Sequence, residues 1–445
     1  MQWQRLRNLA RAFELPDVKR RILFLFAMFA VYVAGAHVPL PGIDREKLAD
    51  FFQAGGLLEF LDAFAGGSLK RFSIFALGIM PYINASIIFQ LLTMAIPSLE
   101  QMQREEGEYG RRKIAQWTRY LTVGLALLQG FGLVSMLRST GAFVAEPIFV
   151  PMVVLTLTAG TSFLMWLGEQ ITDKGIGQGV SLIIFVGIMT RMPTDIAQTI
   201  SQWRVGEVGF FNVFFLAAVF VGMVAFIVYI HQAQRKIPVQ YAKRVKGMKV
   251  YGGSTSFLPL KVNQAGVIPI IFAVSVALFP ATIARFIFTP TVVESLGGLP
   301  FLSSEGVQAA IFNIQQWTTP GDNWTATGFY FLLVILFTYF YTAATFNPEQ
   351  IADNMRKSGG FIPGIRPGKP TKDYLDQIMY RITLVGALFL GVVAVSQYYI
   401  GPITGVRTFN LVGGTSLLIV VGVALDTMLQ VEAHLLMRHY EGFIK

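Results

Sequence analysis

Cysteine is absent from this chain of 445 residues, and charged residues are scarce. Without cysteine there can be no disulfide, no thiolate zinc site, no iron–sulfur cluster and no cysteine nucleophile. Only 14% of the residues are charged, against roughly a quarter in soluble globular proteins, whereas 53% are hydrophobic. The mean hydropathy of +0.55 and the apolar runs at 22–38 and 329–346 therefore predict a polytopic membrane protein rather than soluble domains or a disordered chain.

Groups suited to catalysis or to metal binding are also few. The four histidines, His37, His231, His434 and His439, include no pair spaced by three or four residues, so a helical metal site is not expected. No Ser-His-Asp set, HExxH motif or P-loop is present, and the glycine-rich stretch 175–179 lacks the Lys-Ser/Thr that would follow a P-loop. We therefore expect a protein that is not an enzyme and that has no metal and no cofactor.

Ten apolar segments are candidates for membrane spans, since a bilayer core needs about 20 helical residues. They lie near 22–40, 72–96, 114–137, 148–167, 180–192, 211–230, 266–288, 329–346, 382–400 and 411–429. The segment at 180–192 is the uncertain one, because Pro193 ends its apolar run after only 13 residues.

The distribution of basic residues decides whether this short segment crosses. The arm 1–21 carries six Lys and Arg, and the loop 232–262 carries seven with no acidic residue. Basic loops remain in the cytoplasm, and only an even number of crossings places both on that side. The short segment is therefore expected to cross. Ten spans then leave both termini, including the tail 431–445, in the cytoplasm.

A short repeat links the second span of each set of five. Residues 78–83 (GIMPYI) and 266–271 (GVIPII) align on their prolines as Gly-apolar-apolar-Pro-apolar-Ile. Because each half, 22–200 and 211–430, has an odd number of spans, the halves are expected to be inverted relative to each other. Such repeats surround a site at the midplane, although glycine and proline are also common in unrelated membrane helices.

The segment 48–70 is too charged to span the membrane and too apolar for a free loop. Three acidic residues, Asp62 among them, interrupt its apolar residues, and glycine pairs at 55–56 and 66–67 provide hinges. The residues leave two interpretations open: an amphipathic helix on the outer interface, or a segment that re-enters the protein.

The middles of the spans carry no Asp, Glu, Lys or Arg. Such residues within spans usually mark ion or proton pathways. Here Arg119, Glu169, Arg285 and Asp426 lie near span ends, where snorkelling or a local partner satisfies them. Aliphatic residues instead occupy positions that could face an interior and form a hydrophobic constriction, which gates by dewetting. They are Ile79, Ile83, Ile184, Ile271, Val276 and Ile419. From the residues alone, ordinary helix packing is the simpler explanation of this set.

Two cytoplasmic loops hold most of the polar information. The loop 232–262 is long enough for a protruding hairpin and has more positive charge than topology requires. In the loop 347–378, Arg366 lies between two Pro-Gly pairs at 363–368, which predict a rigid exposed turn. Contact with anionic lipid is one interpretation, but docking to ribosomal RNA phosphates or to an acidic protein surface is favoured.

Longer motifs resemble the SecY family, whose members form the channel of the bacterial Sec translocase. The resemblance extends over nearly the whole chain and is weak only in the outer loops 138–150 and 285–326. Its strongest segments are 72–90 (FSIFALGIMPYINASIIFQ), 172–181 (TDKGIGQGVS), 259–269 (PLKVNQAGVIP), 347–370 (NPEQIADNMRKSGGFIPGIRPGKP) and 413–426 (GGTSLLIVVGVALD). It implies an all-α polytopic membrane protein, in which ten transmembrane helices in two inverted five-helix halves form an hourglass channel with a lateral gate.

The resemblance also assigns roles to residues. It implies that the six aliphatic residues above form a ring at the waist of the channel, with Val276 where the family usually has isoleucine. It implies a plug on the outer side at 57–67, which favours re-entry over the interfacial helix. The plug residues are Leu57, Leu58, Phe60, Leu61, Phe64, Gly66 and Gly67.

A lateral gate is implied between spans 2–3 and spans 7–8, where signal sequences pass into lipid. Its positions are Asn84, Gln129, Asn263 and Phe279, with Gln129 and Asn263 in a polar cluster that helps to hold the gate shut. The resemblance further implies docking of the SecA motor or the ribosome on the two basic loops. The docking residues are Lys243, Arg244, Lys246, Lys249 and Arg366.

The implied function is a protein-conducting channel in the bacterial cytoplasmic (inner) membrane, which passes unfolded secretory polypeptides across and releases transmembrane segments sideways into lipid. The implied partners are SecE, SecG, SecA, the ribosome, polypeptides with signal sequences and anionic lipids, and assembly as a dimer or higher oligomer is left open. A secondary transporter would share inverted repeats and broken helices but would need a coupling-ion site that the span middles lack. An intramembrane enzyme would need a nucleophile–base pair or metal ligands at depth.

Overall fold

The computed structural model describes residues 15–44, 47–48, 62, 65–104, 106–139, 141–143, 149–241, 244–246, 249–251, 255–287, 323–406 and 414–441. Within these ranges the chain is mostly helical, and each of the ten expected spans overlaps a helix of 16 residues or more. In chain order these helices are α2 (Pro16–Ala36), α5 (Met80–Ala95), α7 (Gly107–Ser139), α8 (Phe149–Lys174), α9 (Gly179–Val205), α10 (Phe210–Gln232), α11 (Ile268–Ile287), α14 (Trp324–Thr345), α16 (Lys369–Thr404) and α17 (Gly414–Glu441). Two short helices, α6 (Pro97–Arg104) and α15 (Pro348–Lys357), follow α5 and α14.

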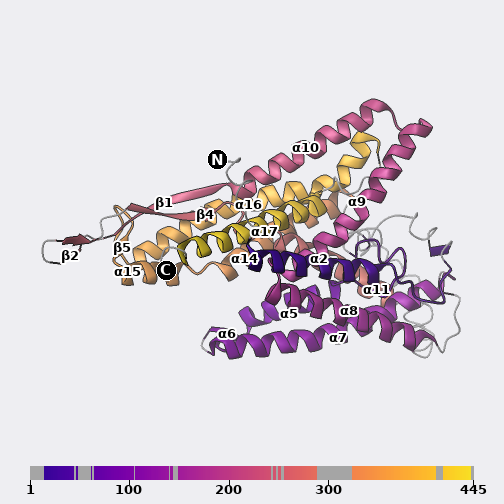
Figure 1. Ribbon diagram of the computed structural model, residues 1–445, viewed down its shortest axis with the longest axis horizontal. Helices are drawn as coiled ribbons and strands as arrows, with labels where there is room; N and C mark the ends of the chain where they lie inside the picture. The colour runs from indigo at the N-terminus through magenta and orange to yellow at the C-terminus, as the bar shows by residue number, and fades with distance from the viewer. Residues whose placement is uncertain are drawn as a thin grey trace.

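The helices of the two halves lie side by side along the long axis of the molecule (Figure 1). In the first half α5 contacts α7, α7 contacts α8, α8 contacts α9, and α2 packs against α8 and α9. In the second half α11 contacts α14, α14 contacts α16, α16 contacts α17, and α10 packs against α16 and α17. Because the five helices of each half have the same neighbours in the same order, the fold consists of two repeats of one unit.

The starts of α5 and α11 explain why the two repeat motifs share glycine and proline. Gly78 and Gly266 have positive φ angles of 56° and 66°, a conformation that glycine adopts without strain. Each helix begins two residues later, at Met80 and Ile268, and proline is its second residue. Proline is tolerated there because the first N–H groups of a helix have no partner within it.

The short fifth segment is part of a long helix. α9 continues through Pro193 to Val205, although proline removes one helical hydrogen bond. The Thr194 hydroxyl donates to the carbonyl oxygen of Arg191 over 2.6 Å. Proline is tolerated inside membrane helices, and because α9 continues through Pro193 for 27 residues in all, the segment is long enough to cross.

The basic loop after α10 forms the expected hairpin, which projects from one end of the helices (Figure 1). Strands β1 (Gln234–Tyr241) and β4 (Thr255–Lys261) pair antiparallel, from Gln234 opposite Lys261 to Gln240 opposite Thr255. Beyond them β2 (Arg244–Lys246) pairs with β3 (Lys249–Tyr251). A short strand from the second basic loop, β5 (Gly360–Phe361), pairs with the other edge of β1. The two basic loops are therefore joined in one sheet, which the sequence did not predict.

Candidate functional site

All six predicted ring residues belong to one apolar cluster at the centre of the molecule. Ile79, Ile83, Ile184 and Ile419 are buried in it, and Ile271 and Val276 are partly buried against it. They come from the start of α5 and from α9, α11 and α17, so both halves contribute.

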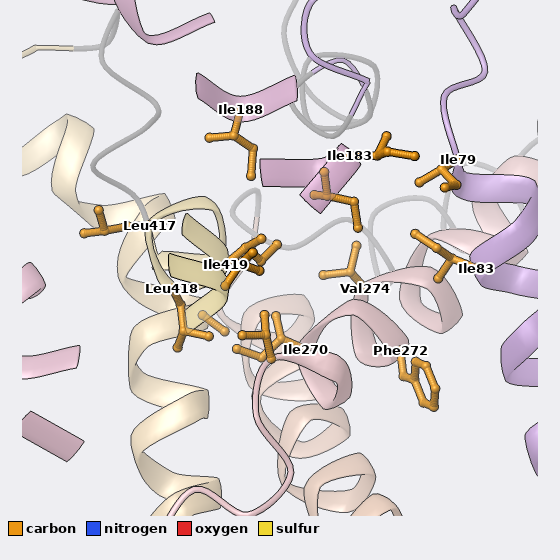
Figure 2. Packing of buried hydrophobic residues seen from close by; sticks show 14 of the residues in the cluster. Ile79, Ile83, Ile183, Ile188, Ile270, Phe272, Val274, Leu417, Leu418 and Ile419 are labelled. Atoms are coloured by element: carbon orange, nitrogen blue, oxygen red, sulfur yellow. The ribbon is translucent and has the colours of Figure 1, made fainter. Parts of the chain in front are cut away.

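The cluster also contains residues that the sequence did not single out. Figure 2 shows Ile83 of α5, Val274 of α11 and Ile419 of α17 approaching one another, with Ile183 of α9 close by. On α11 Ile270 and Val274 are buried, as are Phe272, Ala273 and Ala277, whereas Ile271 and Val276 are only partly buried. The spacing of four residues between Ile270 and Val274 puts them on one helix face, and this periodicity is the signal that could have identified them.

The last part of the predicted plug is packed inside the protein. Gly66 has a φ of +66°, and a Cβ added to it would lie 2.6 Å from Gly187 Cα in α9 and 2.8 Å from the Tyr32 hydroxyl of α2. In the chain that follows, Leu69 and Phe72 are buried in a cluster shared with α7 and α8, while Lys70 between them is exposed. This contact with α9 agrees with re-entry rather than with a helix on the outer interface. Gly67 is described, whereas the other predicted plug residues, Leu57, Leu58, Phe60, Leu61 and Phe64, lie outside the described residues.

Three of the four predicted gate residues lie on helices that meet across the two halves, and the fourth, Asn263, lies between β4 and α11. Asn84 is on α5 and Gln129 on α7, both half-buried, and both helices contact α11. Phe279 lies on α11, with its side chain outside the described part of the structure. The seam between α5, α7 and α11 is thus present in the fold.

Gln129 and Asn263, which the resemblance places in a polar cluster at the gate, are not joined by a hydrogen bond in the described part of the chain. Asn263 is buried, but within the described part of the chain neither atom of its side-chain amide has a hydrogen-bond partner. It follows β4 and lies against α16, where a Cβ on Gly386 would approach its Cα to 3.7 Å.

Arg366 is exposed on a turn that the chain holds rigidly. Gly364 and Gly368 adopt φ angles of +82° and +100° on either side of it, and the Thr371 hydroxyl donates to the Arg366 carbonyl oxygen over 2.8 Å. The turn rests on a small apolar core that joins the hairpin, the turn and the start of α16. Its buried members are Ile237, Leu260, Ile362, Leu375, Ile378, Met379 and Ile382.

The other predicted docking residues lie at the far end of the hairpin. Arg244 and Lys246 are on β2 and Lys249 is on β3, with Lys246 opposite Lys249. Lys243 lies outside the described residues. The hairpin thus carries its basic residues away from the helices (Figure 1).

Charged residues near the span ends have partners, as expected. Arg119 Nε lies 2.7 Å from Glu169 Oε1, joining α7 and α8. Asp426 Oδ1 lies 3.4 Å from His231 Nε2, joining α17 and the end of α10. These pairs account for three of the four intramembrane charges without an ion pathway. The side chain of the fourth, Arg285, falls outside the described part of the structure.

The SecY family model matches residues 73–428 of this chain. The chain is 44% identical over 451 residues to the protein translocase subunit SecY of Streptomyces galbus, covering 98% of this chain and 99% of that protein. It is 40% identical over 445 residues to the corresponding subunit of Aquifex aeolicus, with coverage of 97% and 98%.

Solved structures show the same fold at low sequence identity. A protein-conducting channel superposes with a TM-score of 0.63 at 16% identity, covering 96% of each chain. Sec61 in a canine ribosome–channel complex gives a TM-score of 0.63 at 17% identity, again covering 96% of each chain. The chain is a multi-pass membrane protein of ten helices in two inverted halves, and it belongs to the SecY family.

Proposed function

We propose that this chain is the channel-forming subunit of a protein translocase. It passes unfolded secretory polypeptides across the bacterial cytoplasmic membrane and releases transmembrane segments sideways into lipid. The observation that carries the proposal is the apolar cluster between the two halves, to which helices of both halves contribute. Its role is transport rather than catalysis.

An apolar waist suits a channel for many different polypeptides. Specific polar groups would favour some side chains over others, whereas an aliphatic ring fits any of them. When the channel is empty, a constriction of this kind holds water and ions poorly and seals by dewetting. We assign the ring to Ile79, Ile83, Ile184, Ile271, Val276 and Ile419, and the plug that covers it on the outer side to residues 57–67.

The seam between α5 and α7 on one side and α11 and α14 on the other is the proposed lateral gate. α7 and α11 are in contact and belong to different halves, so moving the halves apart would open a path from the waist to lipid. Asn84, Gln129, Asn263 and Phe279 are the proposed gate residues.

Energy has to come from a partner, and the sheet formed by the two basic loops is the proposed docking site. A SecA motor or a ribosome would supply the acidic surface that matches Lys243, Arg244, Lys246, Lys249 and the exposed Arg366. SecE and SecG are proposed as accompanying subunits, anionic lipids as contacts of the basic loops, and both termini are placed in the cytoplasm.

The test is reconstitution of the full-length chain with the accompanying subunits in proteoliposomes. With a motor and ATP, an unfolded polypeptide that carries a signal sequence is expected to become protected from external protease. Protection that requires the motor but not this chain would refute the proposal, and uptake of a small solute without a motor would favour a secondary transporter.

The waist makes a separate prediction about sealing. Ile83 and Ile419 approach the same centre from opposite halves, so replacing both with serine should let water persist there and raise the resting ion conductance in planar bilayers several-fold. Ile378→Ser, which changes a buried residue of the cytoplasmic core, serves as the matched control and should not leak. Unchanged conductance of the double variant at normal expression would mean that these residues do not form the seal.

A further inference from the structure

A cluster of buried charged residues attaches the proposed plug segment to α9. Asp62, which is 2% exposed, places Oδ2 3.5 Å from Nη1 of Arg191 in α9. Arg191 Nε lies 3.4 Å from Oδ1 of Asp195, one turn further along the same helix. All three side chains are largely shielded from solvent, so the guanidinium is shared between two buried carboxylates.

The same short segment has other contacts that fix its path. Asp62 Oδ1 accepts a hydrogen bond from the Lys70 backbone N–H over 2.9 Å, which closes a loop around residues 65–67. The Tyr32 hydroxyl of α2 donates to the Ala65 carbonyl oxygen over 3.3 Å, and Gly66 packs directly on Gly187 of α9. The contacts of Ala65 and Gly66 are neutral and would be lost if residues 65–67 moved away from α2 and α9, whereas the bond between Asp62 and Lys70 lies within the segment itself.

Burying the charged groups costs more free energy than burying the groups that make the neutral contacts. Burial raises the pKa of Asp62, and this effect exceeds the opposite effects of the Lys70 N–H and the Arg191 charge. The carboxylate therefore loses more by leaving water than it gains from Arg191. A pair of this kind adds little net stability, but removing one partner leaves a buried charge uncompensated and is strongly unfavourable.

We propose that Arg191 is a positioning residue that latches Asp62, and with it the turn at 65–67 at the root of the plug, to α9. The latch defines one seated position for the plug, and its low net stability lets the plug leave when a polypeptide enters. The inference rests on the proposed plug function of 57–67 and adds the residue that holds the plug closed.

The absence of cysteine allows the latch to be tested with one probe. Ser68 is fully buried beside the root, so Ser68→Cys in the full-length chain, reconstituted with its accompanying subunits, should react slowly with a membrane-impermeant maleimide added outside. Arg191→Gln should increase the labelling rate several-fold and raise the resting ion leak. Arg191→Lys, which keeps the charge, should leave both near the original values.

A double variant distinguishes the loss of the ion pair from a general loosening of the packing around it. Asp62→Asn keeps an acceptor for the Lys70 N–H but removes one of the two carboxylate charges, on Asp62 and Asp195, that Arg191→Gln strands. Adding it to Arg191→Gln should therefore reduce the labelling rate, whereas independent effects would increase it. Thr404→Cys, buried on α16 in the other half, should stay unlabelled in all variants.

Each outcome decides a distinct claim. Unchanged labelling of Ser68→Cys in Arg191→Gln would overturn the latch, as would additive effects of the two substitutions or equal exposure of Thr404→Cys. Faster labelling without any leak would support the latch but overturn the assignment of this segment as the plug.

Discussion

Arg366→Glu is expected to abolish motor-driven translocation while leaving the chain folded and inserted. Arg366 is exposed on a turn held by Gly364, Gly368 and the Thr371 hydroxyl, so its side chain contributes little to stability. Reversing its charge places a carboxylate against an acidic partner, and like charges across an interface are strongly unfavourable. Translocation into proteoliposomes and binding of the motor measure the effect.

The control for this prediction is Lys357→Glu, because Lys357 is also exposed on the same cytoplasmic loop but lies on α15. It should retain most of the activity. Single charge removals at Lys243, Arg244, Lys246 and Lys249 should weaken binding by smaller amounts that diminish as salt rises. Wild-type translocation by Arg366→Glu would exclude this turn as the coupling point.

The second large effect is expected at the seam between α5 and α11. These helices are in contact and carry Asn84 and Phe279, which we place on facing sides. In a chain without cysteine, Asn84→Cys with Phe279→Cys is the sole thiol pair, and a disulfide forms readily only when the Cα atoms lie within about 7 Å. Oxidation should cross-link the pair and stop translocation until reductant is added.

Either single-cysteine variant should translocate normally under the same oxidant, which controls for damage by oxidation. Failure of the pair to cross-link would show that the two positions do not face each other. Complete cross-linking with continued passage of clients would show that α5 and α11 need not separate, and the lateral gate would then have to lie elsewhere.

The helices could be predicted where they cross the bilayer, because the bilayer requires apolar residues there. Ten apolar segments gave ten helices, and basic residues identified the fifth as a span although its apolar run is only 13 residues. Their ends outside the apolar runs were less predictable: α16 begins at Lys369, where the sequence indicated a span from 382. Helical turns outside the membrane carry charge, so hydropathy does not detect them.

The parts of the site that depend on tertiary contacts could not be predicted. The pairing of β5 with β1 joins residues more than a hundred positions apart, and no local pattern indicates it. The acidic residues of 48–70, Asp62 among them, left an interfacial helix and re-entry both open, and the sequence did not indicate that Arg191 of α9 would accompany Asp62 when it is buried. The Gln129–Asn263 pair came from a motif resemblance, which gives positions along helices but not the neighbour that each side chain meets.

The sheet formed by β1, β4 and β5 determines which half of the molecule a docked ribosome or motor would hold in place. β1 continues from α10, β4 leads into α11, and β5 precedes α16, so every strand is anchored in the second half. The first half is joined to it in sequence by the turn at Gly206, which has a φ of +82° and open space around it. A ribosome or motor bound to the sheet would therefore hold the second half in place. Opening of the seam would then move the first half relative to the second.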